Sequence, residues 1–177
     1  QDTEVKILSI ILRWTREGIE YEAGQRHADL LVKEMGLEEA KPVATPMVPM
    51  CSSETEEEKD IELGHSESTK IRSITARVNY ISADRPDLQF ACKSASKNMS
   101  KPTQRGWELL KRIVRYIKGR PRVVQKFPWE SAPHDMEAYA DSDWAGDRRT
   151  LKSTSGGVIA WGRHVLKTWS TSQSTLA

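Results

Sequence analysis

Three aspartates lie close together in the C-terminal third of the sequence, at Asp141, Asp143 and Asp147. An apolar, strand-like segment precedes them and a glycine-rich turn follows. Because side chains alternate between the two faces of a strand, Asp141 and Asp143 are expected on one face near a strand end. Carboxylate oxygens grouped in this way suit Mg²⁺, which prefers oxygen ligands. The spacing therefore makes Asp141 and Asp143 candidate metal ligands.

The same aspartates allow two other interpretations. In one, the strand ends in a polar surface turn, where Asp143 or Asp147 caps backbone N–H groups. In the other, Asp141, Asp143 and Gly146 stand at positions one, three and six of a calcium loop. Position twelve is then Lys152, where a bidentate glutamate is required, so the calcium loop is rejected. Capping and magnesium binding remain as alternatives.

The most basic stretch of the chain is residues 101–126. It holds nine Lys and Arg and one acid, Glu108, for a local charge of +8 against +2 for the whole chain. Charge separated in this way predicts a surface that faces phosphates. The alternative is a solvated helix face, which normally mixes both signs at i,i+4 spacing. The candidate nucleic-acid contacts are Arg105, Lys111, Arg112, Arg115, Lys118, Arg120 and Arg122.

Hydrophobic spacing predicts the elements that carry these residues. An apolar, β-branched run starting at Val5 predicts a β-hairpin over residues 5–23, with its turn at 15–18. A helix is expected over 25–35, and Gly36 ends it. Three further helices are expected, the first over residues 69–82. The second restarts within Asp84-Arg-Pro-Asp87, with Asp84 as its cap and Pro86 in its first turn, and runs to about residue 99. The third covers 102–119, with an apolar stripe of Leu110, Ile113, Val114 and Ile117.

The C-terminal part has the period of strands. Residues 123–129 are expected to form a short strand or a connector. Three antiparallel strands should follow as a meander, with a tight hairpin turn at Gly162 and Arg163; their ranges are 136–143, 154–161 and 165–171.

Residues 41–68 are expected to form an acidic linker. Pro42, Pro46 and Pro49 disfavour a helix, and between residues 52 and 68 seven acids stand against Lys59. The composition is that of a soluble chain, with 37% hydrophobic residues and a mean hydropathy of −0.62. No signal peptide and no apolar run near the ~20 residues of a membrane span is visible. We therefore expect an intracellular location and no membrane contact.

Four motifs of the chain, which occur in the same order as in the family, resemble motifs of the Pol polyproteins of copia-type retrotransposons. They are Tyr139-Ala-Asp-Ser-Asp-Trp-Ala-Gly-Asp with Ser153-Thr-Ser-Gly-Gly, Asn79-Tyr-Ile-Ser-Ala-Asp-Arg-Pro-Asp, Met99-Ser-Lys-Pro-Thr with the segment from Trp107 to Gly119, and Lys41-Pro-Val-Ala-Thr-Pro. The resemblance implies an α+β chain with four parts. Residues 1–40 would end the reverse transcriptase region, 41–68 form the acidic linker, and 69–130 form a three-helix basic connection region. Residues 131–177 would begin a truncated ribonuclease H-like domain.

The resemblance also implies a chemistry. Asp141 matches the catalytic aspartate of the first ribonuclease H strand, which binds Mg²⁺ as cofactor. The implied partners are an RNA–DNA hybrid or duplex nucleic acid and the remainder of the polyprotein. The polymerase motif Tyr-x-Asp-Asp does not occur, and the chain stops before the glutamate-bearing helix of the family. We therefore expect a fragment without hydrolytic activity of its own. The alternative is a non-catalytic, nucleic-acid-binding remnant.

Overall fold

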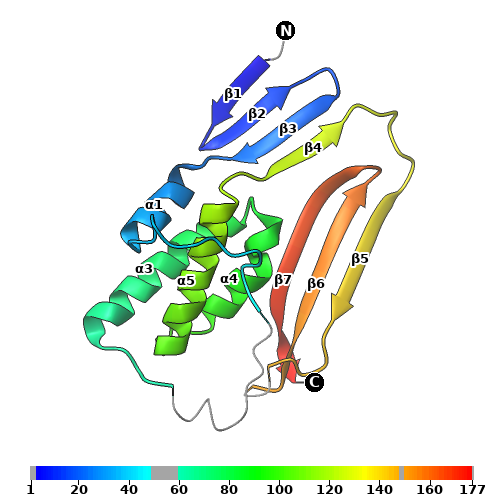
Figure 1. The fold of residues 1–177 in the computed structure, drawn as a ribbon. Coiled ribbons are helices and arrows are strands. Elements are labelled where there is room, and N and C mark those ends of the chain that lie inside the picture. Colours follow the sequence, from blue (N-terminus) through cyan, green and yellow to red (C-terminus); the bar gives the residue numbers. More distant parts are fainter. Residues whose placement is uncertain (1–2, 49–59, 148–149, 177) are drawn as a thin grey trace. The chain divides into compact units, whose positions relative to one another are not determined.

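A computed structural model describes residues 3–48, 60–147 and 150–176 of the chain. It combines helices with two antiparallel sheets (Figure 1). The chain divides into two compact units: residues 1–24 with 123–177, and residues 25–122. The predicted α+β class is confirmed, and the assignment of the C-terminal sheet to a ribonuclease H-like fold stays a prediction. The four predicted segments likewise stay a prediction about the parent polyprotein.

The unit formed by residues 1–24 and 123–177 contains both sheets. Its first sheet has four strands in the order β1-β2-β3-β4. Their bounds are β1 (Thr3–Ile7), β2 (Ile10–Trp14), β3 (Gly18–Ala23) and β4 (Val124–Pro128). The expected single strand over residues 5–14 is wrong, because the chain reverses at Leu8 and Ser9. Both residues have positive φ, 48° and 71°, as the tight turn between β1 and β2 requires.

Strand β4 completes this sheet from far along the chain. It pairs antiparallel with β3, from Gly18 opposite Pro128 to Glu22 opposite Val124. The segment predicted as either a strand or a connector is therefore a strand. The whole of residues 25–122 lies in sequence between two strands that are direct neighbours.

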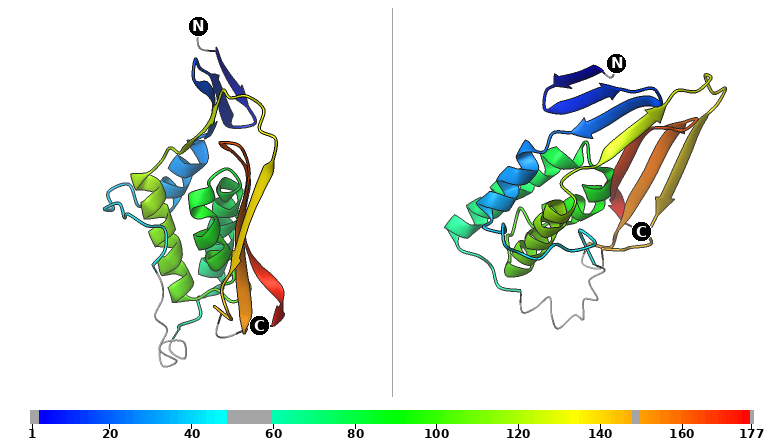
Figure 2. Two further views of the ribbon diagram at one scale, coloured as in Figure 1. Left: turned by 90° about the vertical axis from the view of Figure 1, so that its right-hand side faces the viewer. Right: turned by 45° about the horizontal axis from the view of Figure 1, so that its top comes forward.

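The second sheet is the predicted meander. Strands β5 (Met136–Ser142), β6 (Lys152–Trp161) and β7 (His164–Leu176) pair in that order and run side by side (Figure 2). The expected tight turn is confirmed, since Trp161 pairs with His164 and Gly162 has φ +58°. Gly157 lies opposite Trp169, whose ring occupies the space that a Cβ atom would need.

The second unit is helical and carries the apolar core. Its elements are α1 (Arg26–Glu34), α3 (His65–Ser82), the 3₁₀ turn η1 (Pro86–Leu88), α4 (Gln89–Ser96) and α5 (Gln104–Gly119). These confirm the predicted helices. The buried apolar side chains found among the described residues all come from this unit, between Ala28 and Ile117. None of the described helices is long and apolar enough to cross a membrane.

Helix α3 begins at His65, four residues before the expected Thr69. The N–H of Gly64 donates to the Glu67 carboxylate, which caps the first turn. Just before it, the N–H of Leu63 donates to the carbonyl of Pro102, and Gln104 donates to Ile61. The C-terminal end of the expected linker is thus paired with the start of α5.

An ion pair between the buried Arg85 and the half-buried Asp87 lies at the start of η1, and Tyr116 links it to α5. Arg85, only 2% exposed, donates from Nε and Nη2 to the two carboxylate oxygens of Asp87 at 2.9 and 2.8 Å. The hydroxyl of Tyr116 donates to the same carboxylate at 2.9 Å. The predicted restart at Asp84-Arg-Pro-Asp87 is therefore held by side chains as well as by the proline.

Candidate nucleic-acid interface and carboxylate turn

Asp141 lies in β5, opposite Gly156 of β6, and its side chain is exposed. Its Oδ1 accepts a hydrogen bond from the N–H of Ser142 at 2.9 Å. All seven residues of β5 are exposed. Tyr139, two residues earlier in the strand, is exposed too and donates its hydroxyl to Glu137 at 2.8 Å. That hydrogen bond, together with the carboxylate charge, raises the pKa of the Tyr139 phenol.

Asp143 follows the end of β5 and holds the turn. Its Oδ1 accepts from the N–H of Thr154 at 2.8 Å and of Gly146 at 3.2 Å. Gly146 fits closely here, because a Cβ atom at that position would lie 2.3 Å from Asp143 Oδ2. Asp147 caps in the same way, accepting from the N–H of Thr150 at 3.3 Å. The capping interpretation is confirmed for both aspartates.

The carboxylates of this turn fit a magnesium ion only in part. Asp141 accepts one local hydrogen bond, so its carboxylate could supply a metal ligand. Asp143 already accepts two backbone N–H groups with one oxygen. Within the described ranges no group of three or more His, Cys, Asp or Glu could hold a metal ion. The assignment of Asp141 and Asp143 as metal ligands, and of Asp141 as catalytic, stays a prediction.

Helix α5 presents its basic residues away from the core. Thr103 caps its first turn, accepting from the N–H of Gly106. The predicted stripe of Leu110, Ile113, Val114 and Ile117 is buried, because these residues pack against the other helices. The cations therefore lie on the flanks and at the C-terminal end of the helix, where positive charge also suits the helix dipole.

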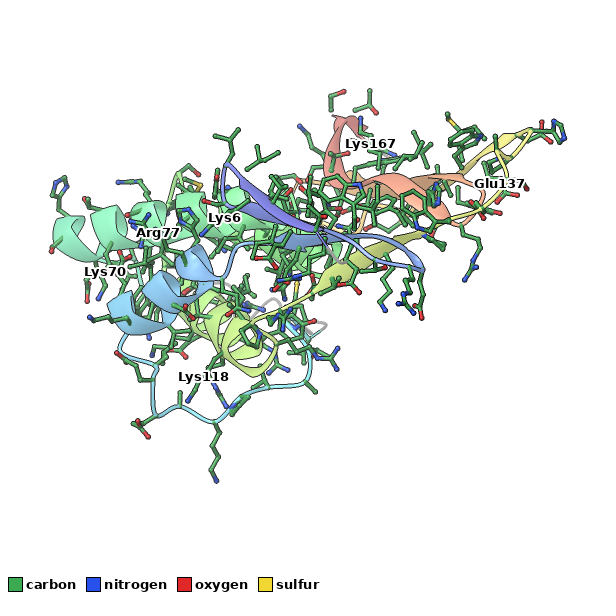
Figure 3. The ribbon with its side chains drawn as sticks, turned by 90° about the horizontal axis from the view of Figure 1, so that it is seen from above. Lys6, Lys70, Arg77, Lys118, Glu137 and Lys167 are labelled. Carbon is green, nitrogen blue, oxygen red and sulfur yellow. The ribbon has the colours of Figure 1, made fainter. Side chains whose placement is uncertain are left out.

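Three of the seven candidate cations contact one segment, residues 38–45, which we call the strap. Lys118 Nζ donates to the carbonyls of Glu38 and Ala40, Arg115 Nε to that of Lys41, and Arg112 Nη2 to Thr45 Oγ1. Lys118 lies where α5 meets the segment that follows α1 (Figure 3). Sequence spacing gave no sign of these contacts, since the partners are 67–80 residues apart.

The other four candidates have different surroundings. Lys111 forms an ion pair with Glu108 at 2.8 Å and lies 6.0 Å from the ring centre of Trp107. Arg105 is half-buried, and its backbone N–H donates to Asp60. Arg120, 5.9 Å from the Tyr116 ring centre, and Arg122 are exposed beyond the end of the helix. The structure therefore divides the basic segment into strap-bound cations and outward cations.

The Arg85–Asp87–Tyr116 group lies close to the C-terminal half of α5 and was not anticipated. Burial opposes ionisation of Asp87, but the hydrogen bonds and charge of Arg85, with the Tyr116 hydroxyl, keep its pKa below the ordinary value. Burial, reinforced by the Asp87 carboxylate, raises the pKa of Tyr116. A sequence signal existed, since Tyr116 falls within the otherwise apolar, buried face of α5.

Comparison with known proteins gives relatives but no matching family model and no matching solved structure. The chain is 35% identical over 133 residues to the retrovirus-related Pol polyprotein from transposon RE2 of Arabidopsis thaliana. It is 26% identical over 152 residues to that from transposon TNT 1-94 of Nicotiana tabacum. These matches cover 74% and 77% of the chain but only 9% and 11% of the relatives. An uncharacterised mitochondrial protein of Arabidopsis thaliana is 28% identical over 143 residues, which is 77% of the chain and 57% of that protein.

Proposed function

The chain belongs to the retrovirus-related Pol polyproteins of copia-type transposons, and we propose that its part in such a polyprotein is to hold nucleic acid by the phosphate backbone. The observation that carries the proposal is the net charge of +6 over residues 104–122 (seven Lys and Arg, one Glu), whose basic side chains lie outside the buried face of α5 and just beyond its C-terminal end. A folded helix concentrates this charge on one surface, where it attracts a polyanion.

The partner we propose is an RNA–DNA hybrid or duplex. Lys and Arg contacts to phosphates fix position without reading bases, so binding should not depend on sequence. The outward cations Arg105, Lys111, Arg120 and Arg122 supply the first contacts. Trp107, flanked by Lys111 and by Lys70 at 5.5 Å, adds an aromatic surface beside them.

For the parent polyprotein we propose RNA-directed DNA synthesis and hydrolysis of the RNA strand of a hybrid. In that setting Asp141 would be one carboxylate ligand of Mg²⁺, and the bound metal would activate water and stabilise the leaving oxygen. The chain contributes an exposed carboxylate at a strand end, and its remaining partners would come from other parts of the polyprotein.

A second candidate is a binding module without metal chemistry. The observation that favours it is the commitment of Asp143 to the backbone of its own turn. NMR detection of the Asp141 and Asp143 carboxylates during Mn²⁺ addition separates the two candidates. Selective broadening at Asp141 supports the metal role, and uniform weak broadening across the acidic residues contradicts it.

Binding itself is tested by titrating a labelled RNA–DNA hybrid at several salt concentrations. Affinity should fall steeply as salt rises, because each neutralised phosphate releases counterions. The double substitution Arg105→Gln/Arg120→Gln should reduce the slope of log affinity against log salt by about 2, roughly 1 for each phosphate that is no longer neutralised. Arg26→Gln/Lys33→Gln, which removes the same two positive charges at exposed positions of α1, is the matched control and should leave the slope unchanged. A chain that binds no hybrid at low salt would disprove the proposal.

A further inference from the structure

The strap, residues 38–45, runs along the cationic side of α5. Arg112, Arg115 and Lys118 are spaced three residues apart, so they follow one side of the helix. Each donates to the strap: Arg112 to the Thr45 hydroxyl at 2.9 Å, Arg115 to the Lys41 carbonyl at 2.7 Å, and Lys118 to the Ala40 carbonyl at 2.9 Å. Three of the cations that the sequence assigns to nucleic acid are therefore engaged within the chain.

The strap satisfies these donors only with neutral oxygens. Among the described residues the three side chains have carbonyl and hydroxyl acceptors and no carboxylate partner. In addition, Arg112 Nε is buried and has no hydrogen-bond partner there. A phosphate oxygen carries negative charge, so it attracts a cationic donor more strongly than a neutral carbonyl or hydroxyl oxygen does. A phosphate backbone would therefore compete well for the same donors.

Packing gives the strap a defined closed position. Val43 of the strap and Met47, two residues beyond its end, pack against the apolar core of the helical unit. Pro42 lies against Gly119 so closely that a Cβ atom on Gly119 would come within 2.7 Å of the Pro42 Cβ. The closed strap thus depends on the absence of a side chain at the last residue of α5.

We propose that the strap is an autoinhibitory segment that competes with nucleic acid for Arg112, Arg115 and Lys118. This inference rests on the proposed function, because it assumes that α5 binds phosphates. When the strap lies on α5, nucleic acid can make only a first, weak contact, through the outward cations. Binding in full requires the strap to leave α5, so the closed population reduces the apparent affinity.

Gly119→Ala opens the strap without removing a cation. The added methyl group collides with Pro42, while alanine suits the helix backbone at this position. We expect hybrid affinity to rise roughly threefold or more, because a larger fraction of molecules then offers all its cations. Gly64→Ala is the matched control, since its Cβ would meet only the end of the Glu67 side chain at 3.8 Å. Unchanged or weaker binding by folded Gly119→Ala, relative to Gly64→Ala, overturns the proposal.

A second measurement follows the strap directly. Val43→Cys, made with Cys51→Ser, places a half-buried thiol in the strap, and the remaining Cys92 is buried. Alkylation of Cys at position 43, followed by mass spectrometry, should be faster when saturating hybrid is bound and slow again at high salt. Hybrid binding without faster alkylation overturns autoinhibition and leaves the proposed function standing. Absence of hybrid binding by any variant overturns both.

Discussion

At the scale of single residues, the structure depends on Asp87 more than on any of the exposed aspartates. Arg85 is 2% exposed, and Asp87 supplies both of the carboxylate oxygens that its guanidinium contacts. A buried cation that loses its partner keeps the cost of its desolvation and gains nothing in return. The sequence predicted a helix restart at this point from Pro86, but periodicity says nothing about which side chain will bury a charge.

Asp87→Asn should therefore destabilise the helical unit strongly. We expect a loss of about 3–5 kcal/mol, the range for breaking a buried pair by removing one partner. Tyr116→Phe removes one hydrogen bond to the same carboxylate and should cost only about 1 kcal/mol. Urea unfolding followed by circular dichroism measures both. Equal losses in the two variants would show that the ion pair is not the dominant interaction.

The same carboxylate makes stability depend on pH in the acid range. The pKa of Asp87 in the folded chain lies below its ordinary value, so its contribution is fully present above the unfolded pKa of about 4. That contribution is lost as pH falls through the folded pKa. The difference in unfolding free energy between the native chain and Asp87→Asn should consequently shrink as pH falls from 5 to the lowest pH at which the chain still folds. Urea unfolding curves recorded at successive pH values measure this difference. A difference that stays constant over this window would contradict the ion-pair account.

At the scale of elements, periodicity predicted the helices well and the strands less well. Helix α5 was predictable because Leu110, Ile113 and Ile117 recur at helical spacing and face one core. The turn between β1 and β2 was missed because Leu8 and Ser9 lack the glycine or asparagine that normally marks positive φ. The positions of the cations on α5 were predictable too. Their partners in the strap were not, since those contacts join segments far apart in the chain.

The turn at Leu8 and Ser9 should be improvable. Both residues have a backbone in the left-handed region, which costs a residue other than glycine roughly 1–2 kcal/mol. The side chain of Leu8 is also 86% exposed, so it contributes little packing. Leu8→Asn/Ser9→Gly supplies the pair that this turn type favours and should stabilise the first sheet by about 1 kcal/mol. Leu8→Ala/Ser9→Ala removes the exposed side chain but keeps the strain, so it should bring no gain. Amide hydrogen exchange in β1 and β2 measures the difference, and equal protection in both variants would refute the turn argument.

At the scale of the whole molecule, the apolar core belongs to one unit. The buried apolar residues of the described chain lie between Ala28 and Ile117, inside residues 25–122. The other unit exposes large side chains, among them Met136 and Tyr139 in β5 and Trp144 in the turn that follows it. Composition predicted enough hydrophobic residues for a core, but only the fold shows that the buried apolar side chains of the described residues lie in the helical unit.

Residues 25–122 should fold when produced alone. The fragment keeps the buried residues and the Arg85–Asp87 pair, so we expect helical circular dichroism and a cooperative urea transition. Ile113→Ala within the fragment is the control that links the transition to core packing, and it should cost about 2–5 kcal/mol. A fragment that is helical yet unfolds without cooperativity would show that its core needs the strands.

The pairing of β3 with β4 has a consequence for biosynthesis. During translation the segment 18–23 leaves the ribosome long before its neighbour at 124–128 has been made. Until then its outer row of N–H and C=O groups is an open sheet edge that another nascent chain could join. Only when the intervening helices have collapsed are the two ends brought close enough to pair, because closing so long a loop of flexible chain is entropically costly. Folding of residues 25–122 is therefore expected to precede the pairing of β4 with β3 that completes the N-terminal sheet.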